Sequence, residues 1–120
     1  MKMFRKDEGF TLVELMVVVL IIGILVAIAI PIFNAAKATA QQKTCYANER
    51  TYEGAYQSFL AGGGLATAVT DYASANSALV PNFIKVAAVC PAAGTYTVTP
   101  GTGGASITMN CTGATGHGHF

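Results

Sequence analysis

One carboxylate stands beside a long apolar segment near the N-terminus. Glu14 is followed by 19 consecutive uncharged and almost wholly apolar residues, from Leu15 to Phe33. An α-helix of roughly 20 such residues crosses the ~30 Å hydrocarbon core of a bilayer. Because a charge at the bilayer centre costs on the order of 2.5 kcal/mol or more, an ionisable group in such a segment is a functional candidate by default. The alternative is that Glu14 lies at headgroup level, since it is close to the start of the segment.

Few other residues are candidates for catalysis or metal binding. The three cysteines, Cys45, Cys90 and Cys111, lack the Cys-x-x-Cys spacing of a zinc signature. Two histidines, His117 and His119, lie in a Gly-rich C-terminal stretch with no third ligand nearby in the sequence, which is more typical of a chain end than of a metal site. No Ser or Cys occupies a nucleophile context such as Gly-x-Ser-x-Gly. The sequence therefore predicts a protein that is not an enzyme and that holds no metal or cofactor.

Charge is sparse and balanced once the first nine residues are set aside. The 120-residue chain has a formal net charge of +1. Beyond position 9 the charged residues are Glu14, Lys37, Lys43, Glu49, Arg50, Glu53, Asp71 and Lys85. A neutral chain without a basic stripe has no electrostatic footprint for nucleic acid. It does suit a subunit that packs against copies of itself without repulsion.

The apolar segment is preceded by basic residues that orient it. Lys2, Arg5 and Lys6 lie on its N-terminal side, so the positive-inside rule predicts a cytoplasmic N-terminus and an external remainder. An ordinary secretory signal has a core of about 7–15 apolar residues and a small-residue cleavage site beyond it. Here the run is longer, and residues 34–40 resemble continuing helix. An Ala-x-Ala cleavage site at residues 36–40 is the alternative.

The residues around Glu14 form a specific motif. The run Gly9-Phe10-Thr11-Leu12-Val13-Glu14, after a basic leader and before an apolar run that contains Pro31, closely resembles the N-terminus of type IV pilins and pseudopilins. In that family a prepilin peptidase cuts after the glycine and methylates the new terminal amine. The resemblance implies cleavage between Gly9 and Phe10, a methylated amine on Phe10, and Glu14 as the assembly glutamate. It covers roughly the first 35 residues.

The resemblance also implies an architecture and a location. We expect an α+β fold, with a leader at 1–9, a transmembrane or filament-core helix at 10–33, an amphipathic helix half at 34–61, and a connecting loop with a small C-terminal antiparallel sheet at 62–120. The precursor would lie in the cytoplasmic membrane of a bacterium or archaeon, and the processed subunit in a surface filament. The implied partners are prepilin peptidase, the assembly machinery, the membrane and other copies of the chain.

The helix is predicted to run from Phe10 to about Ala61. Gly23 and Pro31 are its soft points, because glycine is a weak helix former and proline removes a helical hydrogen bond. They are the predicted sites of local bending or melting, although transmembrane helices often tolerate both residues. Gly62, Gly63 and Gly64 end the helix. The predicted apolar stripe of its second half comprises Ala36, Ala40, Cys45, Tyr52, Tyr56 and Phe59, with Lys37, Gln41, Gln42, Glu49, Arg50 and Glu53 mostly on the opposite side.

The C-terminal half contains short strand signals. Asp71 or Asn76 is expected to cap a short helical turn, and 83–89 is a possible strand. The segments 95–99 and 105–111 flank a Gly/Pro-rich turn and predict a hairpin. Cys90 and Cys111 flank this hairpin, so we favour a disulfide between them, as the resemblance to disulfide-containing pilins also suggests. Cys45 as a partner of either, and a fully reduced chain, remain alternatives.

Several machines share these features. A pilus used in adhesion, motility or DNA uptake and a pseudopilin of a secretion or competence machine have the same N-terminal motif, and the small neutral C-terminal region favours the pilus subunit. A calcium site in the C-terminal loops is not predicted, because acidic residues are absent after Asp71. The rival of a different class is a single-pass membrane-anchored binding module whose N-terminus is never processed.

Overall fold

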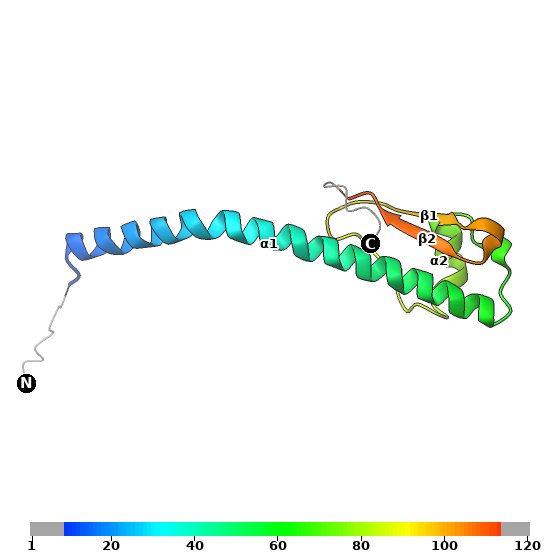
Figure 1. Cartoon of the computed structure of the whole chain (residues 1–120). Coiled ribbons are helices and arrows are strands. Elements are labelled where there is room, and N and C mark those ends of the chain that lie inside the picture. Colours follow the sequence, from blue (N-terminus) through cyan, green and yellow to red (C-terminus); the bar gives the residue numbers. More distant parts are fainter. Residues whose placement is uncertain (1–8, 114–120) are drawn as a thin grey trace, which may run out of the picture. The chain divides into compact units, whose positions relative to one another are not determined.

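The chain folds as a long helix followed by a small antiparallel sheet. The computed structural model describes residues 9–113, and its contacts divide the chain into two compact units, Met1–Lys37 and Ala38–Phe120. Helix α1, Leu12–Ala61, runs through the boundary between them (Figure 1). The predicted α+β class is confirmed, with one long helix that is apolar in its first part and a two-stranded sheet near the C-terminus.

Helix α1 begins with a capping box. The Thr11 hydroxyl accepts a hydrogen bond from the backbone N–H of Glu14 at 3.2 Å, and a carboxylate oxygen of Glu14 accepts one from the backbone N–H of Thr11 at 2.9 Å. This reciprocal pairing satisfies two backbone donors that the first helical turn leaves without partners. The helix therefore starts at Leu12, two residues later than the sequence predicted.

The first unit is helical through both predicted soft points. Gly23 and Pro31 lie inside α1, which is assigned as one helix from Leu12 to Ala61. Proline has no N–H, so the usual hydrogen bond from residue 31 to the carbonyl of Ala27 cannot form. The bending or melting predicted at these two positions stays a prediction, since a single conformation does not test it.

In the second unit α1 buries one face. The buried residues of this helix are Cys45, Glu49, Tyr52, Ala55 and Tyr56. The predicted stripe is confirmed from Cys45 to Tyr56, while Ala36 and Ala40 are exposed. Glu49 is a correction, because the sequence placed it on the polar side and the structure buries it completely.

Glu49 is buried because it and Glu53 accept hydrogen bonds from backbone N–H groups of a strand. Glu49 accepts a hydrogen bond from the backbone N–H of Cys111 at 3.0 Å, and Glu53 accepts one from the backbone N–H of Met109 at 3.2 Å. Residues four apart on a helix and two apart on a strand each share a face, so the two carboxylates meet two successive outward N–H groups of one strand. A buried polar group is stable when it has such a partner.

The glycine-rich segment ends α1 as predicted. The backbone N–H of Gly63 donates to Leu60 and that of Gly64 donates to Phe59, both at 3.0 Å. Gly63 has a φ of 87°, a left-handed conformation that glycine adopts without steric cost. A short 3-10 turn, Ala66–Ala68, follows.

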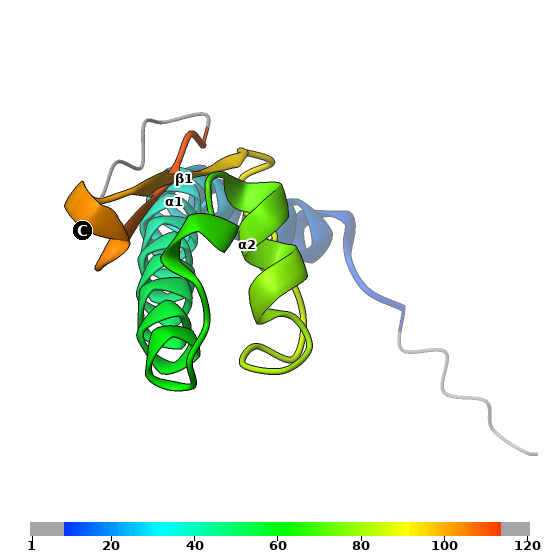
Figure 2. The same ribbon diagram turned by 90° about the vertical axis from the view of Figure 1, so that its right-hand side faces the viewer.

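A second helix, α2, spans Tyr72–Leu79. Asp71 caps it, because its carboxylate accepts a hydrogen bond from the backbone N–H of Ser74 at 2.8 Å, as the sequence suggested. Ala75 and Leu79 of α2 are buried in the same core as Tyr52 and Tyr56 of α1. Figure 2 shows α2 lying beside the second half of α1.

The sheet consists of β1, Tyr96–Pro100, and β2, Ile107–Cys111. They pair antiparallel, with Tyr96 opposite Cys111 and Pro100 opposite Ile107, and a 3-10 turn, Thr102–Gly104, joins them. The predicted hairpin is confirmed within a residue or two at each end. The possible strand at 83–89 is wrong, because these residues form turns and coil without a strand partner.

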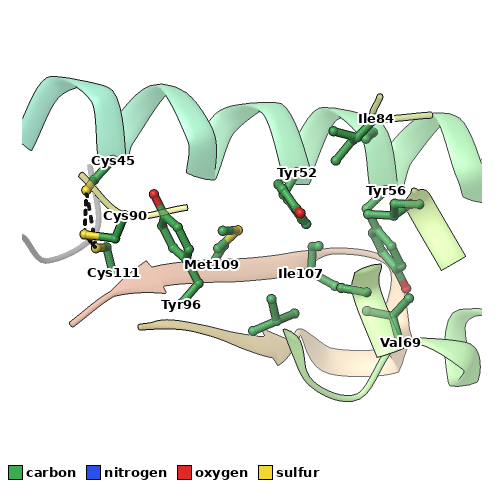
Figure 3. Close-up of a cluster of buried hydrophobic side chains, with 14 residues drawn as sticks. Cys45, Tyr52, Tyr56, Val69, Ile84, Cys90, Tyr96, Ile107, Met109 and Cys111 are labelled. Carbon is green, nitrogen blue, oxygen red and sulfur yellow. Dashed lines mark hydrogen bonds between the residues drawn. The ribbon is translucent and has the colours of Figure 1, made fainter. Parts of the chain in front are cut away.

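The core of the second unit lies between α1, α2 and the sheet (Figure 3). Tyrosine side chains from α1 link it to distant loops. The Tyr56 hydroxyl donates to the carbonyl of Gly104 at 2.7 Å, and the Tyr52 hydroxyl donates to Asn76 while accepting from the backbone N–H of Ala88. Burial raises the pKa of Tyr52 to about 12, so this phenol stays neutral and keeps its donor.

Candidate functional site

The predicted processing site lies just outside the helix. Gly9 and Phe10 are exposed and not helical, and the Phe10 side chain is 88% exposed. A peptidase requires an accessible peptide in a non-helical conformation, and the bond between these residues meets both conditions. The remainder of the predicted leader, residues 1–8, lies outside the described residues.

Glu14 is held at the end of α1 by its own chain. One carboxylate oxygen accepts hydrogen bonds from both the backbone N–H and the hydroxyl of Thr11, each at 2.9 Å. A negative group in the first turn is also stabilised by the partial positive charge of the helix N-terminus. The carboxylate is therefore held against Thr11, the residue that follows Phe10 in the chain.

Sequence reasoning missed this capping box. The signal was present, because Thr11-Leu12-Val13-Glu14 matches the Ser/Thr-x-x-Glu pattern of such boxes directly before an apolar run. Glu14 thus has a local role in starting the helix in addition to the assembly role that the resemblance implies.

The first unit presents an apolar surface that the described part of the chain does not bury. Its most apolar 18-residue window has a mean hydropathy of 3.3, and none of that window is buried. Large side chains such as Ile21, Ile24 and Leu25 are 51–60% exposed. This helix is long and apolar enough to cross a membrane. Soluble monomers rarely expose apolar surface on this scale.

Shallow apolar hollows mark this surface. One lies between Leu15, Met16, Val19 and Leu20, and a second is lined by Val26, Ala29, Ile30 and Phe33 with Asn34. Side chains of a neighbouring helix pack into grooves of this kind. The first unit therefore has the shape and composition for helix–helix packing.

The remaining predicted site residues lie in the second unit. Cys90 and Cys111 are close together, with their Sγ atoms 3.2 Å apart, and Cys45 lies beside both. No disulfide joins these three cysteines in the structure. The disulfide between Cys90 and Cys111 stays a prediction. His117 and His119 lie outside the described residues.

Comparisons with known proteins agree with the N-terminal motif. Residues 4–30 match the family model described as the prokaryotic N-terminal methylation motif. The chain is 45% identical over 62 residues to a fimbrial protein, EcpB, of Eikenella corrodens, and 48% identical over 54 residues to the type IV major pilin protein PilA of Myxococcus xanthus. No solved structure matches the chain.

These matches are confined to part of each protein. They cover 52% and 45% of this chain, and only 39% and 24% of EcpB and PilA, respectively. The predicted resemblance to type IV pilins is thereby confirmed for the N-terminal motif and for the two named relatives. What those relatives do as whole proteins is not carried over by similarity alone.

Proposed function

We propose that this chain is the structural subunit of a type IV pilus-like filament. The observation that supports this most is the methylation motif at residues 4–30 joined to a helix whose apolar side chains are exposed. Transfer of so much apolar surface out of water is strongly favourable. A bilayer covers it in the precursor, and the helices of neighbouring subunits cover it in the filament.

Processing would convert the membrane-bound precursor into a subunit that can enter the filament. A prepilin peptidase would cleave the exposed Gly9–Phe10 bond and methylate the amine of Phe10. Removal of the leader takes away Lys2, Arg5 and Lys6, which hold the N-terminus on the cytoplasmic side. The domains then follow the predicted division: leader 1–9, filament-core helix 10–33, amphipathic half 34–61, and the loop and sheet of 62–120.

Assembly would use the new amine. A charged group in apolar surroundings is costly when unpaired and far less so when it is paired and hydrogen-bonded. The Phe10 amine of an incoming subunit can pair with Glu14 of a subunit already in place. Because this contact joins different surfaces of the two copies, it repeats without closing and generates a filament.

Gly23 and Pro31 would give the packed helices local freedom. Both lie within the segment proposed to form the filament core, and neither supports an ideal helix. The partners of the chain are thus other copies of itself, the prepilin peptidase, the assembly machinery and the membrane. The filament would lie on the surface of a bacterial or archaeal cell.

The decisive experiment is the intact mass and N-terminal residue of protein sheared from cells. We expect a chain that begins at methylated Phe10 and that comes from high-molecular-weight fibres. A chain that keeps residues 1–9 and is not shed would contradict the proposal and favour the membrane-anchored binding module.

A pseudopilin of a type II secretion or competence machine is the alternative within the filament class. It shares the processing site and Glu14, so N-terminal analysis does not separate the two. Fibre length at native expression does, because the pilus proposal expects long surface fibres. A chain that begins at methylated Phe10 and forms no such fibres would favour the pseudopilin.

A further inference from the structure

Three sulfur atoms from three separate segments meet inside the second unit (Figure 3). Cys45 comes from α1, Cys90 from the loop before β1, and Cys111 from the end of β2. Their Sγ atoms are 3.3 Å apart for Cys45 and Cys111, 3.5 Å for Cys45 and Cys90, and 3.2 Å for Cys90 and Cys111. All three side chains are buried.

The sulfur separations single out no pair. A disulfide requires two sulfurs about 2.05 Å apart, and it would leave the third thiol packed against it. A tetrahedral Zn²⁺ with Zn–S bonds of about 2.3 Å places its sulfurs roughly 3.8 Å apart. The nearly equal separations seen here need only a small expansion to reach that value, and a metal ion would use all three sulfurs.

The turn around Cys90 is arranged to stabilise a thiolate. The backbone N–H groups of Ala92 and Gly94 lower the pKa of Cys90, and that of Gly113 acts in the same direction on Cys111. A side chain at Gly94 would collide with the backbone of Gly113, so the two segments are in close contact. N–H donors around sulfur are the outer partners that orient and tune a metal ligand.

Of these three thiols, only Cys90 has a lowered pKa. Burial acts to raise the pKa of Cys90, but hydrogen bonds from the Cys111 thiol and from the N–H groups of Ala92 and Gly94 outweigh it and lower that pKa. Burial raises the pKa of Cys111 to about 12, and that of Cys45 also lies above its usual value. A bound cation supplies the positive charge that lets all three ionise, since a coordinating thiol is deprotonated outright.

A surface pocket borders the cluster at Cys90. A surface pocket of about 310 Å³ is lined by Tyr72, Ala88, Cys90, Gly94 and Tyr96, among others. Cys90 forms part of its wall, so an ion in this pocket would need to pass only this residue to reach the cluster. It also gives solvent a way to supply a fourth ligand.

We propose that Cys45, Cys90 and Cys111 together bind one thiophilic divalent cation of the Zn²⁺ class. Three thiolates favour a soft or borderline metal, and a divalent ion offsets more of their negative charge than a monovalent one. Each thiol releases its proton to solvent on binding. The ion would tie α1, the loop before β1 and β2 together at a single point. This site does not depend on the filament proposal, because all three ligands lie in the second unit.

The test uses the full chain in detergent, reduced by a phosphine and stripped of metal by a chelator. Zn²⁺ is then titrated in competition with a chromophoric chelator, and Cd²⁺ is titrated while its sulfur-to-metal charge-transfer band is recorded. We expect one ion per chain by native mass spectrometry and a charge-transfer band that saturates at the same ratio. This measurement on the unaltered chain needs no variant to fold.

Variants identify the ligands. Cys45→Ser, Cys90→Ser and Cys111→Ser should each weaken Zn²⁺ binding by more than the roughly 10- to 100-fold that loss of an outer-shell partner causes. The matched control is the double change His117→Ala and His119→Ala, which removes both histidines of the chain and should leave binding unchanged. Far-ultraviolet circular dichroism checks that each variant is folded.

Two results would overturn the proposal. One is a reduced wild-type chain that takes up no Zn²⁺ or Cd²⁺, or that binds them equally well in all three cysteine variants. The other is oxidation by glutathione disulfide to a Cys90–Cys111 disulfide at the same rate with and without Zn²⁺, because a bound ion should block those sulfurs. Neither result bears on whether the chain forms filaments.

Discussion

The two parts of α1 belong to one helix and yet meet opposite environments. Up to Lys37, large apolar side chains are exposed on every side of the helix. From Cys45 onward, one face is buried against α2 and the sheet while the other remains in solvent. The first part therefore presents its apolar side chains to its surroundings, and the second part buries them within the chain's own fold. We therefore expect substitutions in the first part to affect processing and filament yield, and substitutions in the second part to affect the free energy of unfolding.

The largest expected effect is at the proposed processing site. Gly9→Val places a β-branched side chain beside the scissile bond, so we expect cleavage to stop and the leader to remain. The measurement is the intact mass of the membrane-bound chain. A trimmed chain in this variant would contradict cleavage after Gly9.

The second largest effect is expected at the proposed assembly contact between the Phe10 amine and Glu14. Glu14→Val removes the carboxylate that would pair with the Phe10 amine, so we expect filament yield to fall to near zero while the membrane-bound subunit persists. Sheared fibres are quantified against total subunit by immunoblot.

A control separates this assembly role from helix capping. Thr11→Val removes the hydroxyl that holds Glu14 but keeps the carboxylate, and it should reduce yield far less than Glu14→Val. Equal yields from Glu14→Val and the wild type would rule out the amine–carboxylate contact.

The same substitution in both parts of the molecule tests the comparison directly. Met109 in β2 is fully buried, and Met109→Ala should lower the free energy of unfolding by about 2–5 kcal/mol through lost packing and a cavity. Met16 is 63% exposed, and Met16→Ala should leave unfolding of the second unit unchanged. Denaturant unfolding in detergent, followed by near-ultraviolet circular dichroism, gives both values. Similar losses from the two changes would refute the division into independent environments.

The smallest expected effect concerns the cap of α2. Hydrogen bonds from the backbone N–H and hydroxyl of Ser74 hold the pKa of Asp71 below its usual value. A folded-state pKa below the unfolded value makes the ionised cap stabilising above about pH 4, and this contribution is lost as the pH falls through the lowered pKa.

Asp71→Asn separates the cap from its charge. Asparagine also caps helices well, so stability at neutral pH should change little, while the part of the acid sensitivity due to Asp71 should disappear. The midpoint of thermal unfolding between about pH 2 and 6 measures this. An unchanged pH profile would show that the Asp71 carboxylate does not contribute.

Much of the fold follows from local patterns. The apolar run, the spacing of Cys45, Tyr52 and Tyr56, the glycines after Ala61 and the alternation around residue 97 each act over a few residues, so the sequence predicts both helix ends and the hairpin closely. The segment 83–89 was misjudged because β-forming residues alone do not supply a partner strand.

The N-terminal motif is likewise a property of the sequence. Gly9, Phe10 and Glu14 are contiguous with the apolar run, and neither their recognition nor the exposure of the helix requires a tertiary fold. The capping box of Thr11 and Glu14 was also readable from spacing, because its two members are three residues apart.

Only the tertiary structure decided what lies in the core of the second unit. Glu49 and Glu53 looked like surface charges until the outward N–H groups of Met109 and Cys111 were placed against them. Cys45, Cys90 and Cys111 show no metal spacing in sequence, yet their sulfurs lie within 3.5 Å of one another. Contacts across 21 to 66 positions depend on how helix, loop and strand pack together. The periodicity of a single segment does not predict that packing.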